Sequence, residues 1–261
     1  MRQYGIIGNP LGHSWSARLF NERFEREGID ARYALYPMTE LNDRTLDELI
    51  RANRLDGFNV TIPYKQTIIP LLDEVTETAV AIGAVNVVRV LWNEERYRLV
   101  GYNTDYTGFR ESLSPLLQGL GNNLKALVLG TGGAARAVAY ALSHPCGEKD
   151  RLWEVTMVSR KNTLKEMDGI KVVTYKELNE DIVRQNTLIV NGTPVGMYPH
   201  VEECPTIPYS AIGKNHILYD CIYNPVETLF LRKGREQGAR TQNGLQMLEL
   251  QAREAWRRFK I

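Results

Sequence analysis

The sequence has 261 residues, a length that suits two compact domains and allows a large buried core without disulfide bonds. Hydrophobic residues make up 43% of the chain and charged residues 24%, as in an ordinary soluble globular protein. Lys and Arg number 32 against 31 Asp and Glu, so the net charge is +1 and we expect no nucleic-acid partner.

Several features bear on location and metal binding. The chain has no run of about 18 apolar residues, so we expect no membrane span. Its first residues lead directly into a predicted strand, so we expect no signal peptide. Cys146, Cys204 and Cys221 are scattered, with no Cys-x-x-Cys pair and no convincing set of four metal ligands nearby. We therefore expect a cytoplasmic protein without a metal. We also expect a monomer or a homodimer, although these features do not decide the oligomeric state.

Short apolar runs alternate with amphipathic stretches in the first hundred residues, a rhythm typical of βαβ units and a mostly parallel sheet. Two β-rich runs around a polar turn then predict an antiparallel hairpin. A helix and a loop rich in Gly and Asn follow, and the loop is a candidate domain boundary. The predicted strands are 3–8, 31–36, 57–62, 84–91 and 97–102, the helices 15–28, 46–54 and 104–117, and the loop 118–123.

The alternation restarts after this loop and predicts a second α/β domain. Its predicted strands are 126–129, 155–158, 187–190 and 216–219, with a helix at 133–143. A long amphipathic helix at 245–259 follows. Periodicity leaves open whether this helix packs on the second domain or returns to the first.

A glycine-rich turn joins the first strand and the first helix of the second domain. The pattern is G-x-G-x-x-A, in which Gly130 permits a tight turn, Gly132 lets the backbone approach a pyrophosphate, and Ala135 allows close packing of helix and strand. The N–H groups at the helix N-terminus would then face the phosphates. A tight turn without a ligand and the nucleoside site of a methyltransferase are the alternatives.

The residues after the next strand indicate the type of dinucleotide. An NAD site usually has an Asp or Glu there that binds the ribose hydroxyls, whereas this chain has Ser159, Arg160 and Lys161. A charge-assisted contact to a 2′-phosphate is worth roughly 1.5–3 kcal/mol, so these residues favour NADP. A solvated basic loop is the alternative.

Polar residues also follow two strands of the first half. Ser14 and Ser16 could cap a helix or bind a polyol or a carboxylate. Lys65 comes directly after a strand that Pro63 ends, and a partly buried Lys there is a candidate for proton transfer, with a surface Lys as the alternative. Asp105 begins a helix, either as its N-cap or as the ion-pair partner of Lys65.

Taken together, these segments resemble the shikimate dehydrogenase family, which includes quinate dehydrogenases. The similarity spans nearly the whole chain in the family's order. The matching stretches are 8–10, 13–16, 59–65, 83–86, 103–105, 130–134, 191–197, 219–225 and 243–251.

The resemblance implies an α/β fold with two domains and a cleft between them. The substrate-binding domain would be 1–104, with its mostly parallel sheet, and the NADP-binding Rossmann-like domain 105–239, with a C-terminal helix at 240–261 returning to the first. The implied activity is the reversible, NADPH-dependent reduction of 3-dehydroshikimate to shikimate in chorismate and aromatic amino-acid biosynthesis.

The resemblance also implies roles for individual residues. By the family's pattern, Lys65 transfers the proton and Asp105 is its partner. The implied substrate-binding residues are Ser14, Ser16, Thr61, Asn86, Tyr223 and Gln251. The implied cofactor-binding residues are Glu77, Gly130, Thr131, Gly132, Gly133, Ala134, Ser159, Arg160, Lys161, Thr193, Cys221 and Gly244.

The chain departs from the family's pattern at three places. Thr131 replaces the more usual Ala, the segment 159–161 replaces Asn-Arg-Thr, and Cys221 stands where other members vary. These departures leave the predicted pair of Lys65 and Asp105 intact. A relative that oxidises quinate or prefers NAD, and a non-catalytic NADP-binding regulator, are the alternatives to the implied activity.

Overall fold

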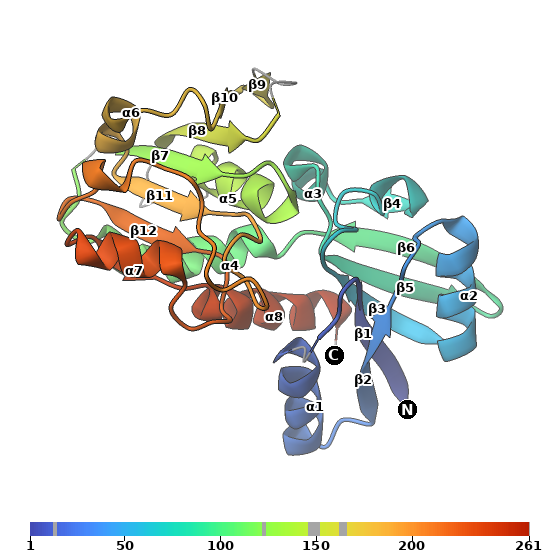
Figure 1. Cartoon of the computed structure of the whole chain (residues 1–261). Helices are drawn as coiled ribbons and strands as arrows, with labels where there is room; N and C mark the ends of the chain where they lie inside the picture. Colours follow the sequence, from blue (N-terminus) through green and yellow to red (C-terminus); the bar gives the residue numbers. More distant parts are fainter. Residues whose placement is uncertain (13–14, 122–123, 146–151, 162–165, 261) are drawn as a thin grey trace. The chain divides into compact units, whose positions relative to one another are not determined.

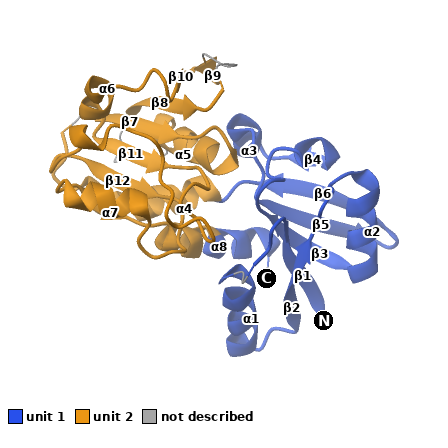
Figure 2. Cartoon of the chain, viewed as in Figure 1, with its two compact units in different colours: residues 1–104, 252–261 blue, residues 105–251 orange. Residues whose placement is uncertain are grey.

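The computed structural model describes residues 1–12, 15–121, 124–145, 152–161 and 166–260. The chain forms two compact units, unit 1 from residues 1–104 and 252–261 and unit 2 from residues 105–251 (Figures 1 and 2). Each unit is an α/β domain built on its own sheet, and both sheets are mostly parallel. None of the helices in the described ranges has both the length and the apolarity that a bilayer span requires.

Unit 1 contains a six-stranded sheet in the order β2-β1-β3-β5-β6-β4. β1 pairs parallel with β2 and β3, and β4 with β6, whereas β5 runs antiparallel to β3 and β6. The elements are β1 (Arg2–Gly8), α1 (Trp15–Glu27), β2 (Ala31–Pro37), α2 (Asp43–Asn53), β3 (Leu55–Val60), the 3₁₀ helix η1 (Ile69–Leu71), β4 (Glu74–Val75), α3 (Glu77–Ile82), β5 (Val87–Asn93) and β6 (Arg96–Tyr102).

Helices cover both faces of this sheet, so its strands are apolar on both sides. Ile7 belongs to the hydrophobic cluster under α2 and α3, whereas its neighbour Ile6 belongs to the cluster under α1 and the last residues of α8 (Leu245–Phe259). The backbone of Gly57 lies against the Phe259 side chain, and a Cβ there would be 2.7 Å from the ring. The end of the last helix, from residue 252 onward, is therefore part of the core of unit 1.

Unit 2 contains a seven-stranded sheet in the order β13-β12-β11-β7-β8-β10-β9, in which only the β9–β10 pair is antiparallel among the described strands. Its elements before α8 are α4 (Asp105–Leu113), the 3₁₀ helix η2 (Ser114–Leu117), β7 (Leu124–Leu129), α5 (Gly133–Ser143), β8 (Trp153–Ser159), β9 (Glu166–Met167), β10 (Ile170–Thr174), α6 (Glu180–Gln185), β11 (Leu188–Asn191), the 3₁₀ helix η3 (Tyr209–Ala211), β12 (Ile217–Asp220), α7 (Leu229–Glu236) and β13 (Arg240–Gln242).

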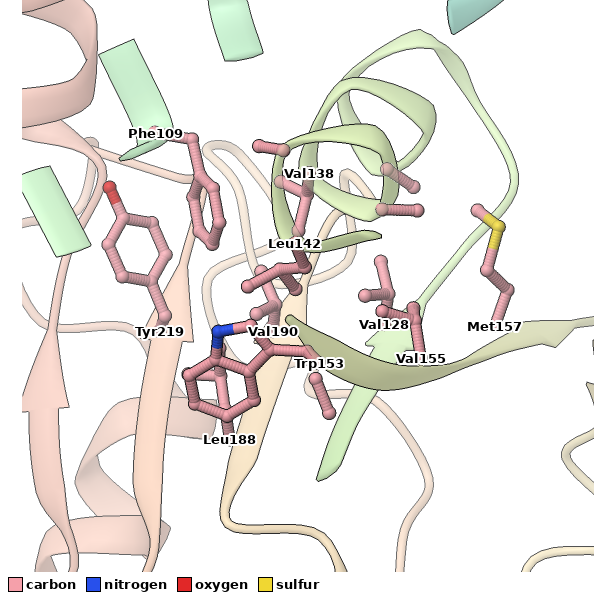
Figure 3. Packing of buried hydrophobic residues seen from close by; sticks show 14 of the residues in the cluster. Phe109, Val128, Val138, Leu142, Trp153, Val155, Met157, Leu188, Val190 and Tyr219 are labelled. Atoms are coloured by element: carbon pink, nitrogen blue, oxygen red, sulfur yellow. The ribbon is translucent and has the colours of Figure 1, made fainter. Parts of the chain in front are cut away.

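Both faces of the second sheet are also buried. Val128 faces the cluster formed with α4 and α5, which Figure 3 shows from close by, whereas Leu127 and Leu129 face the cluster formed with α6, η3 and α7. In the first cluster the rings of Phe109 and Tyr219 meet edge to face, with centroids 4.9 Å apart (Figure 3). This burial explains why the strands read as continuous apolar runs.

The structure confirms the predicted strands and helices around the glycine turn and corrects two helices. The helix predicted at 104–117 ends at Leu113 and continues as η2, because Pro115 has no N–H for the helical ladder. The segment predicted as a helix at 240–261 begins with β13, which pairs with β12, and the helix starts at Leu245. The loop that begins at 118 lies inside unit 2, because α4 before it and β7 after it share one core.

Candidate active site

In unit 1, the candidate residues follow the carboxyl ends of β1 and β3. The N–H of Thr61 donates to the carbonyl of Ile7 (3.0 Å), and the N–H of Val85 donates to the carbonyl of Lys65 (2.7 Å). These bonds hold the non-helical turn that carries Thr61 and Lys65 against β1 and against the segment that precedes β5. The turn is therefore anchored, and both residues are partly exposed.

Asn86 is buried just before β5, and its side chain is held at the end of β6. Its Oδ1 accepts from the N–H of Thr104 (2.7 Å), and its Nδ2 donates to Thr104 Oγ1 (3.0 Å). Behind it, Asn59 Nδ2 donates to the Asn86 carbonyl (3.2 Å) and the hydroxyl of Tyr33 donates to Asn59 Oδ1 (2.8 Å). Burial raises the pKa of Tyr33 well above its usual value, so this hydroxyl stays a donor.

The sequence did not predict the supporting roles of Asn59 and Tyr33. The available signal was one buried amide in the otherwise apolar end of β3, and its tyrosine partner lies 26 residues away.

The remaining candidates of unit 1 lie at helix starts. α1 begins at Trp15, so Ser16 lies inside its first turn and is not the N-cap, and the residue is only 8% exposed. Ser14 lies outside the described residues. Glu77 is the exposed first residue of α3, where a carboxylate complements the helix dipole.

In unit 2, the glycine turn joins β7 to α5. Gly130 has a φ of +105°, which side chains rarely adopt, and a Cβ there would lie 2.9 Å from Thr193 Cγ2. Gly132 is the N-cap of α5 with an extended backbone, and a Cβ added to it would have no heavy atom of another segment within 4 Å. The space in front of the helix N-terminus is therefore open at Gly132.

The first turn of α5 packs closely against the loop after β11. A Cβ at Gly192 would lie 2.8 Å from the Cβ of Ala135, so both residues must be small for this approach. The sequence predicted close packing at Ala135, and the structure shows that Gly192 is the partner. The half-buried Arg136 donates to the carbonyl of Thr131 within the turn (3.3 Å).

The basic segment after β8 lies next to the glycine turn. The N–H of Gly130 donates to the carbonyl of Val158 (2.8 Å), and parallel pairing brings the ends of β7 and β8 to one edge of the sheet. Ser159 is buried, and its Oγ accepts from the N–H of Lys161 (3.1 Å), whereas Arg160 and Lys161 are exposed. Two cations thus face solvent beside the turn.

Three further cofactor candidates lie on neighbouring loops of the same sheet edge. The N–H of Cys221 donates to the carbonyl of Asn191 (3.0 Å), and the N–H of Gly244 donates to the carbonyl of Ile222 (2.9 Å). A Cβ at Gly244 would collide with the Cys221 carbonyl, so only glycine fits there. Thr193 Oγ1 donates to Asn191 Oδ1 (2.6 Å).

The substrate candidates of unit 2 lie on α4, on α8 and after β12. Asp105 is the buried first helical residue of α4, so Thr104 precedes it in the N-cap position. Gln251 is buried on α8, and the close approach of the two helices shows at Gly108, where a Cβ would lie 2.9 Å from the Gln251 Cβ. Burial raises the pKa of Tyr223, which stays neutral. Lys65 belongs to unit 1 and Asp105 to unit 2, so their ion pair stays a prediction.

A depression of about 350 Å³ on unit 1 involves none of the candidate residues. It is lined by Asp43, Leu46, Asp47, Arg51, Leu71, Asp73, Arg96, Tyr97 and Leu99. Across the described residues, no three His, Cys, Asp or Glu side chains are placed to hold a metal ion.

Comparison with known proteins identifies the family. The family model described as shikimate dehydrogenase substrate binding domain matches residues 6–88. A curated relative from Carboxydothermus hydrogenoformans, shikimate dehydrogenase (NADP(+)), is 39% identical over 94% of this chain and 86% of its own length. The chain belongs to the shikimate dehydrogenase family.

Solved structures of this family and a related enzyme share the fold. Shikimate 5-dehydrogenase from Thermus thermophilus, in complex with NADP(H) and shikimate, is 33% identical with a TM-score of 0.82, over 99% of this chain and 93% of its own. Quinate dehydrogenase from Corynebacterium glutamicum, in complex with NAD, is 27% identical with a TM-score of 0.81, over 99% and 93%. Likeness of fold therefore does not separate shikimate from quinate or NADP from NAD.

Proposed function

We propose that this chain is an NADP-dependent shikimate dehydrogenase, which reversibly reduces 3-dehydroshikimate to shikimate in chorismate and aromatic amino-acid biosynthesis. The observation that carries the proposal is the open glycine turn at Gly132, in a chain 39% identical to a curated shikimate dehydrogenase (NADP(+)). We expect the enzyme to act in the cytoplasm as a monomer or a homodimer.

We assign the cofactor to unit 2. The open space at Gly132 and the first N–H groups of α5 fit a pyrophosphate, which needs close backbone approach and a positive helix end. Thr131, Gly133 and Ala134 complete this turn, and Thr193, Cys221 and Gly244 would hold the nicotinamide end. NADPH supplies the hydride when bound.

The basic residues at the end of β8 would select the cofactor. Arg160 and Lys161 are exposed cations beside the glycine turn, where a 2′-phosphate would meet them, and the hydroxyl of Ser159 lies next to them. No acidic residue occupies positions 159–161 to bind the ribose hydroxyls as NAD sites do. Glu77 of unit 1 is the remaining cofactor candidate.

We assign the proton transfer to Lys65. It would donate a proton to the oxygen of the C3 carbonyl during reduction and accept it back during oxidation. Asp105 would favour the charged form of Lys65 as its partner. Ser14 and Ser16 would bind the substrate carboxylate, and Thr61, Asn86, Tyr223 and Gln251 the rest of the substrate.

The first experiment mixes the purified protein with shikimate or quinate and with NADP or NAD, and follows the absorbance of the reduced cofactor. Rapid turnover with shikimate and NADP alone is expected. Turnover with quinate or NAD would instead place the protein with quinate dehydrogenases, a second candidate that the similarity to the Corynebacterium enzyme favours. Inactivity of folded, cofactor-binding protein in all four mixtures would refute the dehydrogenase function.

A further inference from the structure

Asp220, the last residue of β12, is a buried carboxylate that the proposed chemistry does not use. It is 0% exposed, and in the described part of the chain no cationic side chain is paired with it. Three groups donate to it: Asn191 Nδ2 (3.1 Å) and the N–H of Ile222 (3.0 Å) to Oδ1, and Thr228 Oγ1 (2.6 Å) to Oδ2. All its partners are neutral donors.

These bonds connect Asp220 to the loops that carry the cofactor candidates. Asn191 Oδ1 accepts from the N–H (3.1 Å) and the hydroxyl (2.6 Å) of Thr193, so the orientation of the Asn191 amide fixes Thr193. The Ile222 carbonyl accepts from the N–H of Gly244 (2.9 Å), next to the carbonyl of Cys221. One carboxylate therefore supports Thr193, Cys221 and Gly244 together.

The network also ties this sheet edge to the phosphate end of the cofactor site. The methyl group of Thr193 lies so close to Gly130 that a Cβ there would be 2.9 Å away. The N–H of Val195 donates to Thr193 Oγ1 (3.2 Å), and Asn191 Nδ2 also donates to the Val195 carbonyl (3.2 Å). Hydrogen bonds from both side chains and backbone groups therefore hold the loop after β11.

A negative charge at this position is costly, which argues for a specific use. Burying an ionised carboxylate without a cation is unfavourable, and burial raises the pKa of Asp220 to about 6. Hydrogen bonds to a charged acceptor are roughly twice as strong as neutral ones. An asparagine in its place would turn an NH₂ group toward at least one of the three donors.

We propose that Asp220 is a positioning residue of the cofactor site, whose carboxylate fixes Thr193 through Asn191 and the backbone of Cys221 and Gly244 through Ile222. This role rests on the proposed function, because it assumes that these loops meet the nicotinamide end. Because Asp220 is 0% exposed, it would touch neither the substrate nor the cofactor.

The test replaces Asp220 by Asn and measures two properties at alkaline pH, where the wild-type carboxylate is ionised. These are kcat/KM for NADP with shikimate, and binding of NADP and of adenosine 2′,5′-bisphosphate, which lacks the nicotinamide. We expect kcat/KM to fall roughly 10- to 100-fold, from the lost charged hydrogen bonds, and NADP binding to weaken. Binding of the bisphosphate should weaken less than binding of NADP, because Cys221 and Gly244 are assigned to the nicotinamide end, which the bisphosphate lacks, and only Thr193 connects the network to the glycine turn.

Thr228→Val is the matched control. It removes a bond to the same carboxylate and the side-chain cap of α7, but leaves the bonds to Asn191 and Ile222. It should lower the melting temperature and keep kcat/KM near the wild-type value.

Three results would overturn the positioning role: unchanged kcat/KM in Asp220→Asn, equal weakening of both ligands, or an equal loss of kcat/KM in Thr228→Val. Inactive wild-type enzyme would refute the proposed function instead. The ratio of the two binding constants would then still decide the role of Asp220.

Discussion

Replacing Gly132 by Ala should separate cofactor binding from folding. The backbone there (φ −77°, ψ 178°) is allowed for alanine, and the added Cβ would meet no heavy atom of another segment within 4 Å. Alanine is a poorer N-cap than glycine but lowers the entropy of the unfolded chain, and because the two effects oppose each other the free energy of unfolding should change by less than about 1 kcal/mol.

The same methyl group would occupy the space through which a pyrophosphate approaches the helix N-terminus. An extra methyl in a packed contact costs about 1–3 kcal/mol, so NADP affinity should fall roughly 5- to 150-fold. Calorimetric titration with NADP and urea unfolding measure the two effects. Gly213→Ala, also in open space but in the loop before β12, is the control and should change neither. Unchanged NADP affinity in Gly132→Ala would show that the turn does not contact the phosphates.

Four further outcomes are expected. Lys65→Ala should lower kcat by about 10²–10⁴-fold with little change in KM for shikimate, and near-normal turnover would exclude Lys65 from proton transfer. Arg160→Ser should reduce the kcat/KM preference for NADP over NAD roughly 10- to 100-fold, and an unchanged ratio would mean that other groups read the phosphate. Gly57→Ala should lower the free energy of unfolding by about 1–3 kcal/mol, because its Cβ would lie 2.7 Å from the Phe259 ring; unaltered urea unfolding would contradict that packing. The pKa of Asp220, raised to about 6 by burial, exceeds the usual value of about 3.9 in unfolded chains. Its contribution to stability is therefore complete below about pH 4 and lost as the pH rises through 6, by about 3 kcal/mol. The difference in unfolding free energy between wild type and Asp220→Asn should therefore fall as the pH rises from about 4 to above 6. A difference that does not depend on pH would refute the raised pKa of Asp220.

The elements that sequence pattern predicted best are those with the most burial. β7 and β12 each pair with a strand on both sides, and both of their faces contact helices, so most of their residues are apolar or aromatic. β13 was missed because Arg240, Thr241 and Gln242 have no apolar alternation. β13 is a strand because it pairs with β12, and the local sequence does not indicate that pairing.

The same distinction applies to the candidate site: its local features could be predicted from the sequence, and its long-range contacts could not. The glycine turn could be predicted, because the strand, the turn and the helix are adjacent in sequence and together form one local pattern. The network around Asp220 could not, because Asn191 lies 29 residues from Asp220 and only the parallel pairing of β11 and β12 brings them together. The same holds for the bond between Tyr33 and Asn59.

The division of the chain has a consequence for its synthesis. Unit 2 is one continuous stretch, 105–251, whereas unit 1 needs 1–104 together with residues that follow all of unit 2. Ala255, Trp256 and Phe259 complete the aromatic cluster over β1, where the Phe259 and Tyr4 ring centroids are 5.0 Å apart. During synthesis on the ribosome, unit 1 therefore cannot complete its hydrophobic core until the C-terminal residues are made. Unit 2 can finish folding earlier, although its synthesis starts later.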